Sequence, residues 1–92
     1  MENIVHKNIR ITGRVQGVGF RYSARSVANS FGIKGVVKNM PDGAVYIEAE
    51  GTLTRMEDFI AWCNEGPPLA VIQFVDVYDG EVVGFREFVV TN

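Results

Sequence analysis

The residues best suited to chemistry lie in one glycine-rich stretch, Gly-Arg-Val-Gln-Gly-Val-Gly-Phe-Arg at residues 13–21. Glycine adopts backbone angles that other residues avoid, so the three glycines let successive amide N–H groups point into one concavity. Such a concavity before a helix binds anions, because the helix N-terminus has unpaired N–H groups and a partial positive charge. Arg21 adds a planar donor fork that matches a phosphoryl group in two places. By spacing alone, an anion site and a tight turn with a surface arginine fit this stretch equally well.

The elements on either side of the loop follow from the spacing of apolar residues. Strict alternation predicts a half-buried strand over residues 7–15. Apolar residues at i, i+3, i+4 and i+7 then predict a helix that ends at Gly32. His6, which is the only histidine, precedes the strand, and we expect it on the surface rather than as a ligand or a catalytic base. The apolar helix positions are Ala24, Val27, Ala28 and Phe31.

A second pair of strands is expected over residues 34–40 and 44–50, joined by a tight turn. In the first of these strands Asn39 has the same parity as Val37, the best core candidate, so both face the same side. Asn39 therefore lies at the end of its strand, on the helix-covered side of the sheet. In the second strand Val45, Ile47 and Ala49 are expected to point inward, and Tyr46, Glu48 and Glu50 outward.

A second helix is expected over residues 54–64, with Thr54 and Glu57 as a capping box at its N-terminus. Its buried stripe includes Cys63, which we therefore expect to be a core residue and not a nucleophile. Trp62 falls at the edge of the stripe and is expected to be partly buried. The other residues of the stripe are Met56, Phe59 and Ile60.

Two further strands are expected, one with a bulge over residues 70–78 and a short one over residues 85–90. The element order is therefore βαββαβ with a short terminal strand. Two right-handed crossovers of this kind place two helices on one face of an antiparallel sheet. The expected fold class is α+β, a ferredoxin-like sandwich, and we expect residues 1–92 to form a single domain.

Composition and charge narrow the classes of function. The chain of 92 residues is 47% apolar and 22% charged, as in an ordinary soluble globular domain. It has no apolar run of transmembrane length and no signal-like N-terminus, so we expect a cytoplasmic protein. Residues 1–38 hold seven of the nine basic residues and one acidic residue, whereas residues 39–92 hold ten acidic residues. The glycine loop thus lies in the basic part, which can attract a small anionic substrate.

Two stretches of the sequence resemble the two signatures of the acylphosphatase family. Ile-Thr-Gly-Arg-Val-Gln-Gly-Val-Gly-Phe-Arg, at residues 11–21, resembles the first signature. The second is matched by Gly35-Val36-Val37-Lys38-Asn39, followed at the right spacing by Gly43, Val45 and Gly51. The resemblance extends from about Asn8 to Val90. Val36 stands where the family usually has an aromatic residue, a difference that concerns packing rather than chemistry.

The resemblance implies the ferredoxin-like fold and the hydrolysis of acyl phosphates, with Arg21 binding the phosphoryl group and Asn39 orienting the water. The residue types allow this chemistry. The conjugate acid of the leaving carboxylate has a pKa of ~4, so the carboxylate departs without a general acid. The reaction then needs only the alignment of the attacking water and the neutralisation of the phosphoryl charge. The expected donors to the phosphoryl oxygens are Arg21 and the amides of Gln16, Gly17, Val18, Gly19 and Phe20.

The expected ligands are a small-molecule acyl phosphate and inorganic phosphate, the latter as product or inhibitor. No cluster of carboxylates, histidines or cysteines accompanies the loop, so we expect no metal site and no cofactor. Asn39 has a simpler alternative role as a cap of the turn before Pro41, and only the second signature favours a catalytic one. We expect a monomeric, free-standing enzyme.

Other functions share this fold and compete with hydrolysis. A non-catalytic phosphate- or anion-binding module, alone or as a piece of a larger maturation protein, would keep the loop without turnover. A nucleic-acid-binding domain would stack bases on the open face of the sheet, but Glu48 and Glu50 there would repel a phosphate backbone. A metal-carrying domain would need paired cysteines, and Cys63 is the only one. We therefore expect no nucleic-acid partner and no membrane association.

Overall fold

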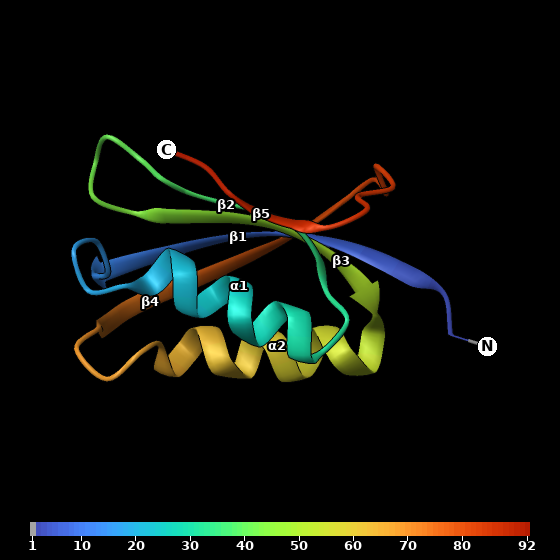
Figure 1. Cartoon of the computed structure of the whole chain (residues 1–92), viewed down its shortest axis with the longest axis horizontal. Helices are drawn as coiled ribbons and strands as arrows, with labels where there is room; N and C mark the ends of the chain where they lie inside the picture. The colour runs from blue at the N-terminus through green and yellow to red at the C-terminus, as the bar shows by residue number, and fades with distance from the viewer. Residues whose placement is uncertain (1) are drawn as a thin grey trace.

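The computed structural model describes residues 2–92 and consists of a five-stranded sheet with both helices on one face (Figure 1). The strands lie in the order β4-β1-β3-β2-β5. Their bounds are β1 Ile4–Arg14, β2 Lys34–Asn39, β3 Val45–Thr52, β4 Val71–Gly80 and β5 Phe88–Val90. The helices are α1 Phe20–Ser30 and α2 Leu53–Glu65. This arrangement confirms the predicted ferredoxin-like α+β fold.

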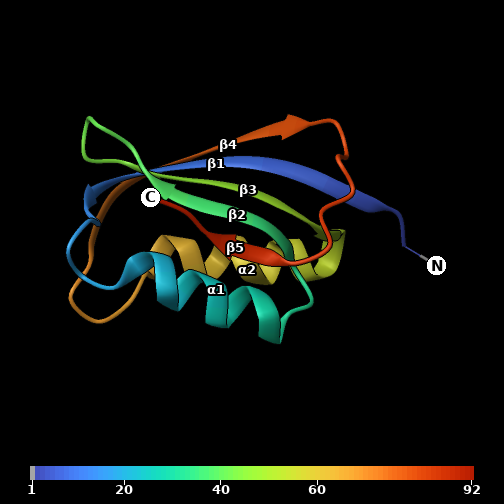
Figure 2. The same cartoon turned by 45° about the horizontal axis from the view of Figure 1, so that its top comes forward.

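The sheet is mixed rather than wholly antiparallel. β1 pairs antiparallel with both β3 and β4, and β2 pairs antiparallel with β3. β5 instead runs parallel to β2, with Gly35 opposite Phe88. Figure 2 shows why: the chain leaves β4, crosses the end of the sheet and returns along β2 in the same direction. β5 is also shorter than the strand predicted over residues 85–90.

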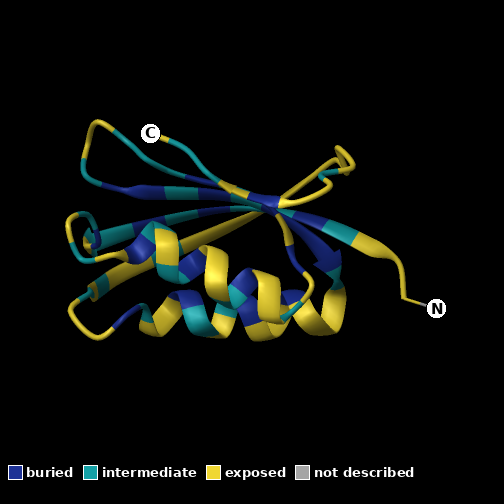
Figure 3. Ribbon diagram, in the orientation of Figure 1, coloured by how far each residue is buried: buried dark blue, intermediate teal, exposed yellow. Residues whose placement is uncertain are grey.

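The core lies between the sheet and the two helices, where the buried side chains of both layers meet (Figure 3). Alternation places every second strand residue on this side, because successive side chains of a strand point to opposite faces. The sheet contributes Ile9, Ile11, Val37, Val45, Ile47 and Ala49. The helices contribute Phe20, Ala24, Ala28, Met56, Phe59 and Cys63.

A bulge in β4 brings this edge strand close to the end of β1. The register between the two strands shifts after Thr12, and Gln73 is left as the extra residue. This confirms the bulge predicted in the fourth strand. Only glycine fits at position 13, because a Cβ there would lie 2.1 Å from the carbonyl oxygen of Val71. β4 can therefore pair with β1 up to the start of the glycine loop.

Two polar residues that we expected to be exposed are buried. His6 and Glu50 point to the helix-free face of the sheet, yet only 4% and 3% of their surfaces are exposed. The segment of residues 81–87, between β4 and β5, covers them. The N–H groups of residues 83–85 donate to the Glu50 carboxylate at 2.5 to 3.0 Å. The ring of Phe85 stacks on His6 with 6.1 Å between centroids.

Both ring nitrogens of His6 lie within hydrogen-bond distance of side-chain oxygens, an arrangement that suits the protonated imidazolium, in which both nitrogens donate. Nδ1 lies 2.6 Å from Glu50 Oε2, and Nε2 lies 3.1 Å from Asn8 Oδ1. Burial lowers the pKa of His6, but the hydrogen bonds to Glu50 and Asn8 and the charges of Glu50 and Glu48 raise it above the ordinary 6.5. Burial raises the pKa of Glu50, but the hydrogen bonds from His6 and residues 83–85 outweigh it and lower that pKa to about 2.

The second helix begins slightly earlier than predicted and is capped by a different residue. Thr52 is the N-cap of α2, and its hydroxyl accepts a hydrogen bond from the Arg55 N–H at 3.4 Å. The predicted cap, Thr54, instead donates its hydroxyl to Glu2 Oε1 at 2.9 Å. Within residues 2–92, neither helix is long and apolar enough to cross a membrane.

Candidate active site

The glycine loop between β1 and α1 has the backbone geometry of an anion-binding concavity. Gly17 and Gly19 have φ angles of 74° and 78°, in the left-handed region that favours glycine. Gly19 is also the N-cap of α1, and no side chain among residues 2–92 caps this helix end. The N–H groups of the first turn of α1 are therefore left for a ligand, which is the arrangement that binds phosphate at helix N-termini.

A pocket at this loop collects most of the residues that we predicted from the sequence. Six of the seven predicted site residues line the pocket, and they belong to the loop, the start of α1 and the end of β2. Val18 is the exception, because its side chain is partly buried against the core. Val15 and Tyr22 also line the pocket and were not predicted. The six predicted lining residues are Gln16, Gly17, Gly19, Phe20, Arg21 and Asn39.

Arg21 is half-buried at the pocket and is held from the C-terminal end of the chain. Its Nη1 donates to the carbonyl oxygen of Thr91 at 2.5 Å. Thr91 is fixed in turn, because its N–H donates to the Val37 carbonyl at 2.9 Å. A guanidinium has five N–H donors, so four remain for a ligand. Arg21 forms no ion pair with any carboxylate in residues 2–92, and its charge at the pocket is uncompensated.

Asn39 has a buried side-chain oxygen that lacks a hydrogen-bond donor. Its Oδ1 is one of two such buried polar atoms in residues 2–92, the other being Thr12 Oγ1. An unsatisfied buried acceptor costs about 1–3 kcal/mol. Asn39 also lines the pocket, so the residue with this unpaired acceptor lies at the pocket wall. The alternative role as a turn cap has no support, because this oxygen accepts no turn N–H.

The side chain of Gln16 ties the glycine loop to the hairpin that carries Asn39. Its Nε2 donates to the carbonyl oxygens of Met40 and Ala44, at 2.8 and 2.9 Å. The prediction from the sequence concerns only the backbone amide of Gln16, and the spacing of the sequence gives no signal for this side-chain bridge. The bridge fixes the distance between the loop and Asn39, on which any joint action of the two depends.

Two other predicted residues contribute to the core rather than to the pocket chemistry. The Phe20 side chain is buried, with its ring centroid 5.2 Å from that of Trp62, so only the Phe20 backbone can serve a ligand. Cys63 is fully buried, and burial raises the pKa of its thiol. The prediction that Cys63 is a core residue is confirmed. Residues 2–92 contain no group of three side chains that could hold a metal ion.

Comparison with known proteins identifies the family. The family model described as Acylphosphatase matches residues 7–90. The chain belongs to the acylphosphatase family. An acylphosphatase of Nostoc sp. is 46% identical over 85 residues, which cover 92% of this chain and 84% of the relative. The predicted resemblance is confirmed, and the chain is an acylphosphatase, an enzyme that hydrolyses acyl phosphates.

Solved acylphosphatase structures share the whole fold. One from Coxiella burnetii has a TM-score of 0.93 and 32% identity, over 97% of this chain and 94% of that one. The chain also matches part of a much larger protein, full-length HypF in a phosphate- and nucleotide-bound form. There the TM-score is 0.90 and the identity 34%, over all of this chain and 12% of HypF.

Proposed function

We propose that this acylphosphatase works without a metal ion, with Arg21 and the loop amides binding the phosphoryl group and Asn39 positioning the attacking water. One observation carries the proposal: two residues with unused hydrogen-bonding capacity line the same pocket. Arg21 has a charge without a carboxylate partner, and Asn39 has a buried acceptor without a donor, both within residues 2–92. A phosphoryl group and one water would satisfy both.

Binding of the phosphoryl group follows from the loop and the helix end. The N–H groups of residues 16–20 and the N-terminal end of α1 supply donors and a partial positive charge. Arg21 adds a full charge and a fork that contacts two phosphoryl oxygens at once. Because these groups are fixed before the substrate arrives, they stabilise the charge of the transition state with little reorganisation.

Hydrolysis then needs one water in line with the leaving group. The water donates a hydrogen bond to Asn39 Oδ1 and attacks phosphorus with its oxygen. The bond between phosphorus and the acyl oxygen breaks, and its electron pair leaves with the carboxylate. An amide is not a base, so the water proton passes to a phosphoryl oxygen of the substrate. The products are a carboxylate and inorganic phosphate, and no protein group changes its protonation state.

The experiment is phosphate release from benzoyl phosphate by the purified chain and by Asn39→Ala. Asn39 contacts only the water, so its removal acts on the transition state rather than on phosphate binding. We expect kcat to fall by at least about 100-fold, as for the loss of one preorganised polar group. Inhibition by inorganic phosphate is expected to stay within about twofold of that of the wild type.

The matched control is Asn29→Ala, an exposed asparagine at the far end of α1, which should keep full activity. Circular dichroism establishes that both variants are folded. Arg21→Lys, which keeps the charge and loses the fork, should lose both turnover and phosphate inhibition. EDTA should leave the wild type unchanged. A folded Asn39→Ala variant with normal kcat would contradict the role of Asn39, and Mg²⁺ restoration of an EDTA-treated enzyme would contradict metal independence.

A further inference from the structure

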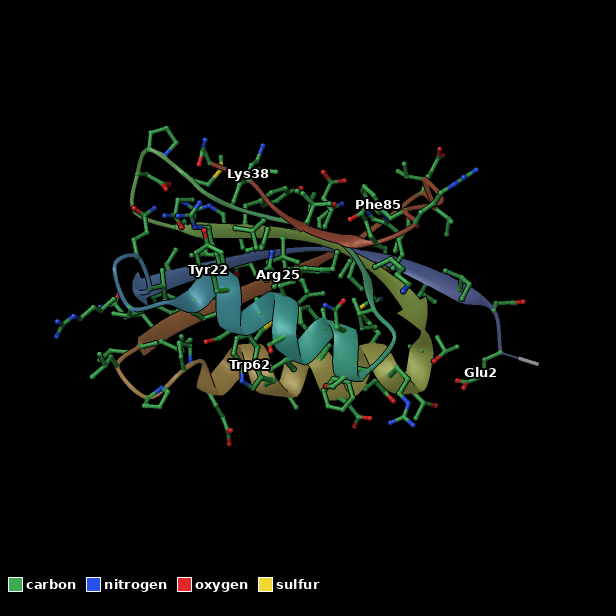
Figure 4. All side chains as sticks on the ribbon, viewed as in Figure 1. Glu2, Tyr22, Arg25, Lys38, Trp62 and Phe85 are labelled. Carbon is green, nitrogen blue, oxygen red and sulfur yellow. The ribbon has the colours of Figure 1, made fainter. Side chains whose placement is uncertain are left out.

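Tyr22 has the most exposed side chain of the pocket lining. Eight residues line the pocket, and only Gly17, Gly19 and Tyr22 among them are exposed. Glycine has no side chain, so Tyr22, which is 59% exposed, has the only exposed side chain of the eight. Figure 4 shows Tyr22 at the N-terminal end of α1, beside the loop.

The direction of attack places the acyl group on the side of the phosphorus away from Asn39; this step rests on the proposed function. In phosphoryl transfer the attacking and leaving oxygens lie roughly in line, on opposite sides of phosphorus. In the proposed mechanism the water is held by Asn39, whose side-chain oxygen is buried and which lies at the end of β2. The leaving carboxylate and its acyl group therefore point away from Asn39, and we take them to extend toward the exposed part of the pocket lining, to which Tyr22 belongs.

The Tyr22 ring contacts a neighbouring cation. The Arg25 guanidinium lies over the ring, with Cζ 5.3 Å from the ring centroid, in the range of a cation–π contact. Arg25 forms no salt bridge within residues 2–92, and α1 contains no acidic residue to draw it away. Figure 4 shows the two side chains on the same stretch of the helix. The ring thus offers an exposed apolar surface beside the pocket, with Arg25 over it.

We propose that Tyr22 determines the acyl specificity of this enzyme, by providing a surface on which planar acyl groups stack. Aroyl phosphates, whose ring is conjugated with the carbonyl, would be favoured over small aliphatic acyl phosphates. Stacked aromatic pairs gain about 0.5–1.5 kcal/mol beyond the burial of their area, which corresponds to as much as about tenfold in kcat/KM.

The test compares benzoyl phosphate with acetyl phosphate, two substrates that share the phosphoryl group and differ in the acyl group. The measured quantity is the ratio of their kcat/KM values. For Tyr22→Ala the ratio is expected to fall by about two- to tenfold, and for Tyr22→Phe, which keeps the ring, it should stay close to that of the wild type. The matched control is Tyr78→Ala, because Tyr78 is 61% exposed but lies in β4, away from the pocket.

The outcomes separate this inference from the proposed function. An unchanged ratio in a folded Tyr22→Ala variant, or an equal fall in Tyr78→Ala, would overturn the specificity role while leaving Arg21 and Asn39 untouched. Failure of the wild type to hydrolyse either substrate would overturn the proposed function itself. A fall in phosphate inhibition for Tyr22→Ala would also count against the inference, because it would place Tyr22 at the phosphoryl end.

Discussion

Replacing Glu50 by glutamine is expected to remove about 3 kcal/mol from the free energy of unfolding at pH 5.5. The Glu50 carboxylate is the anchor of the buried cluster on the helix-free face. It accepts hydrogen bonds from His6 at 2.6 Å and from three successive N–H groups of residues 83–85. Glutamine keeps the shape of the side chain but loses the charge and one acceptor, so His6 and part of the covering segment lose their partner.

The magnitude follows from the pKa of Glu50. Folding lowers this pKa from the ordinary 4.5 to about 2. At 1.36 kcal/mol per pH unit, the folded state therefore favours the charged carboxylate by about 3 kcal/mol. The free energy lost when a hydrogen bond to a charged group is removed, or when a buried ion pair is broken, is of the same order. Because domains of this kind are stable by about 5–15 kcal/mol, the variant is expected to remain folded.

The effect depends on pH in both directions. Glu50 has a lowered pKa, so its contribution is present above pH 4.5 and is lost as the pH falls toward the folded value of about 2. His6 has a raised pKa, so its contribution is present below pH 6.5 and is lost as the pH rises through the raised folded value. The difference between wild type and Glu50→Gln should therefore be largest between about pH 4.5 and 6.5.

The assay is urea unfolding of both proteins at pH 3, 5.5 and 9, followed by circular dichroism. Glu48→Gln is the matched control: Glu48 Oε1 lies 3.4 Å from His6 Nε2, but its side chain is 33% exposed, so the loss should stay below about 1 kcal/mol. The reasoning is refuted if Glu50→Gln costs less than about 1 kcal/mol at pH 5.5. It is equally refuted if the difference from wild type is the same at pH 9.

Two further predictions concern the loop and the core. Gln16→Ala removes the side-chain donor to Met40 and Ala44, whose carbonyls each keep one backbone donor, so we expect unfolding measurements to show a loss of about 0.5–1.5 kcal/mol. Its kcat should fall about tenfold while phosphate inhibition changes little, and an unchanged kcat would show that the hairpin holds Asn39 unaided. Cys63→Ala should cost about 1 kcal/mol of stability and keep turnover, since Cys63 is buried away from the pocket. In the native wild type, rapid inactivation by a thiol reagent would contradict this placement.

The parts of the fold that could be predicted are those in which local periodicity and tertiary packing agree. The parity of Val37 placed Asn39 on the helix-covered side, and the structure has it in the pocket beside α1. Glycine spacing likewise located the loop, because Gly17 and Gly19 adopt the positive φ angles that only glycine takes readily. In both cases the signal lies within a few residues of the feature.

The parts that could not be predicted depend on segments that carry no periodic pattern. The side chains of His6 and Glu50 point to the helix-free face of the sheet, but residues 81–87 cover them. The sequence of that segment has no pattern that predicts this cover. The Gln16 bridge joins residues 24 and 28 positions apart, and its acceptors are backbone carbonyls that every residue has. Tyr22 directly follows Arg21 in the sequence. Its exposure at the pocket depends on how α1 packs against the sheet, which the sequence does not show.

The hydrogen bond from Arg21 to Thr91 makes the orientation of Arg21 depend on a residue 70 positions further along the chain. During synthesis β1 is translated before both of its neighbours in the sheet, β3 and β4, and it can pair with them only after they have been made. The orientation of Arg21 is fixed later still, because the carbonyl that accepts a hydrogen bond from its guanidinium belongs to Thr91, just beyond β5. A nascent chain that has formed the glycine loop and α1 therefore lacks an oriented Arg21. The Arg21 fork is oriented only after the chain up to Thr91 has been translated and folded, and a chain cut before Thr91 would lack that orientation.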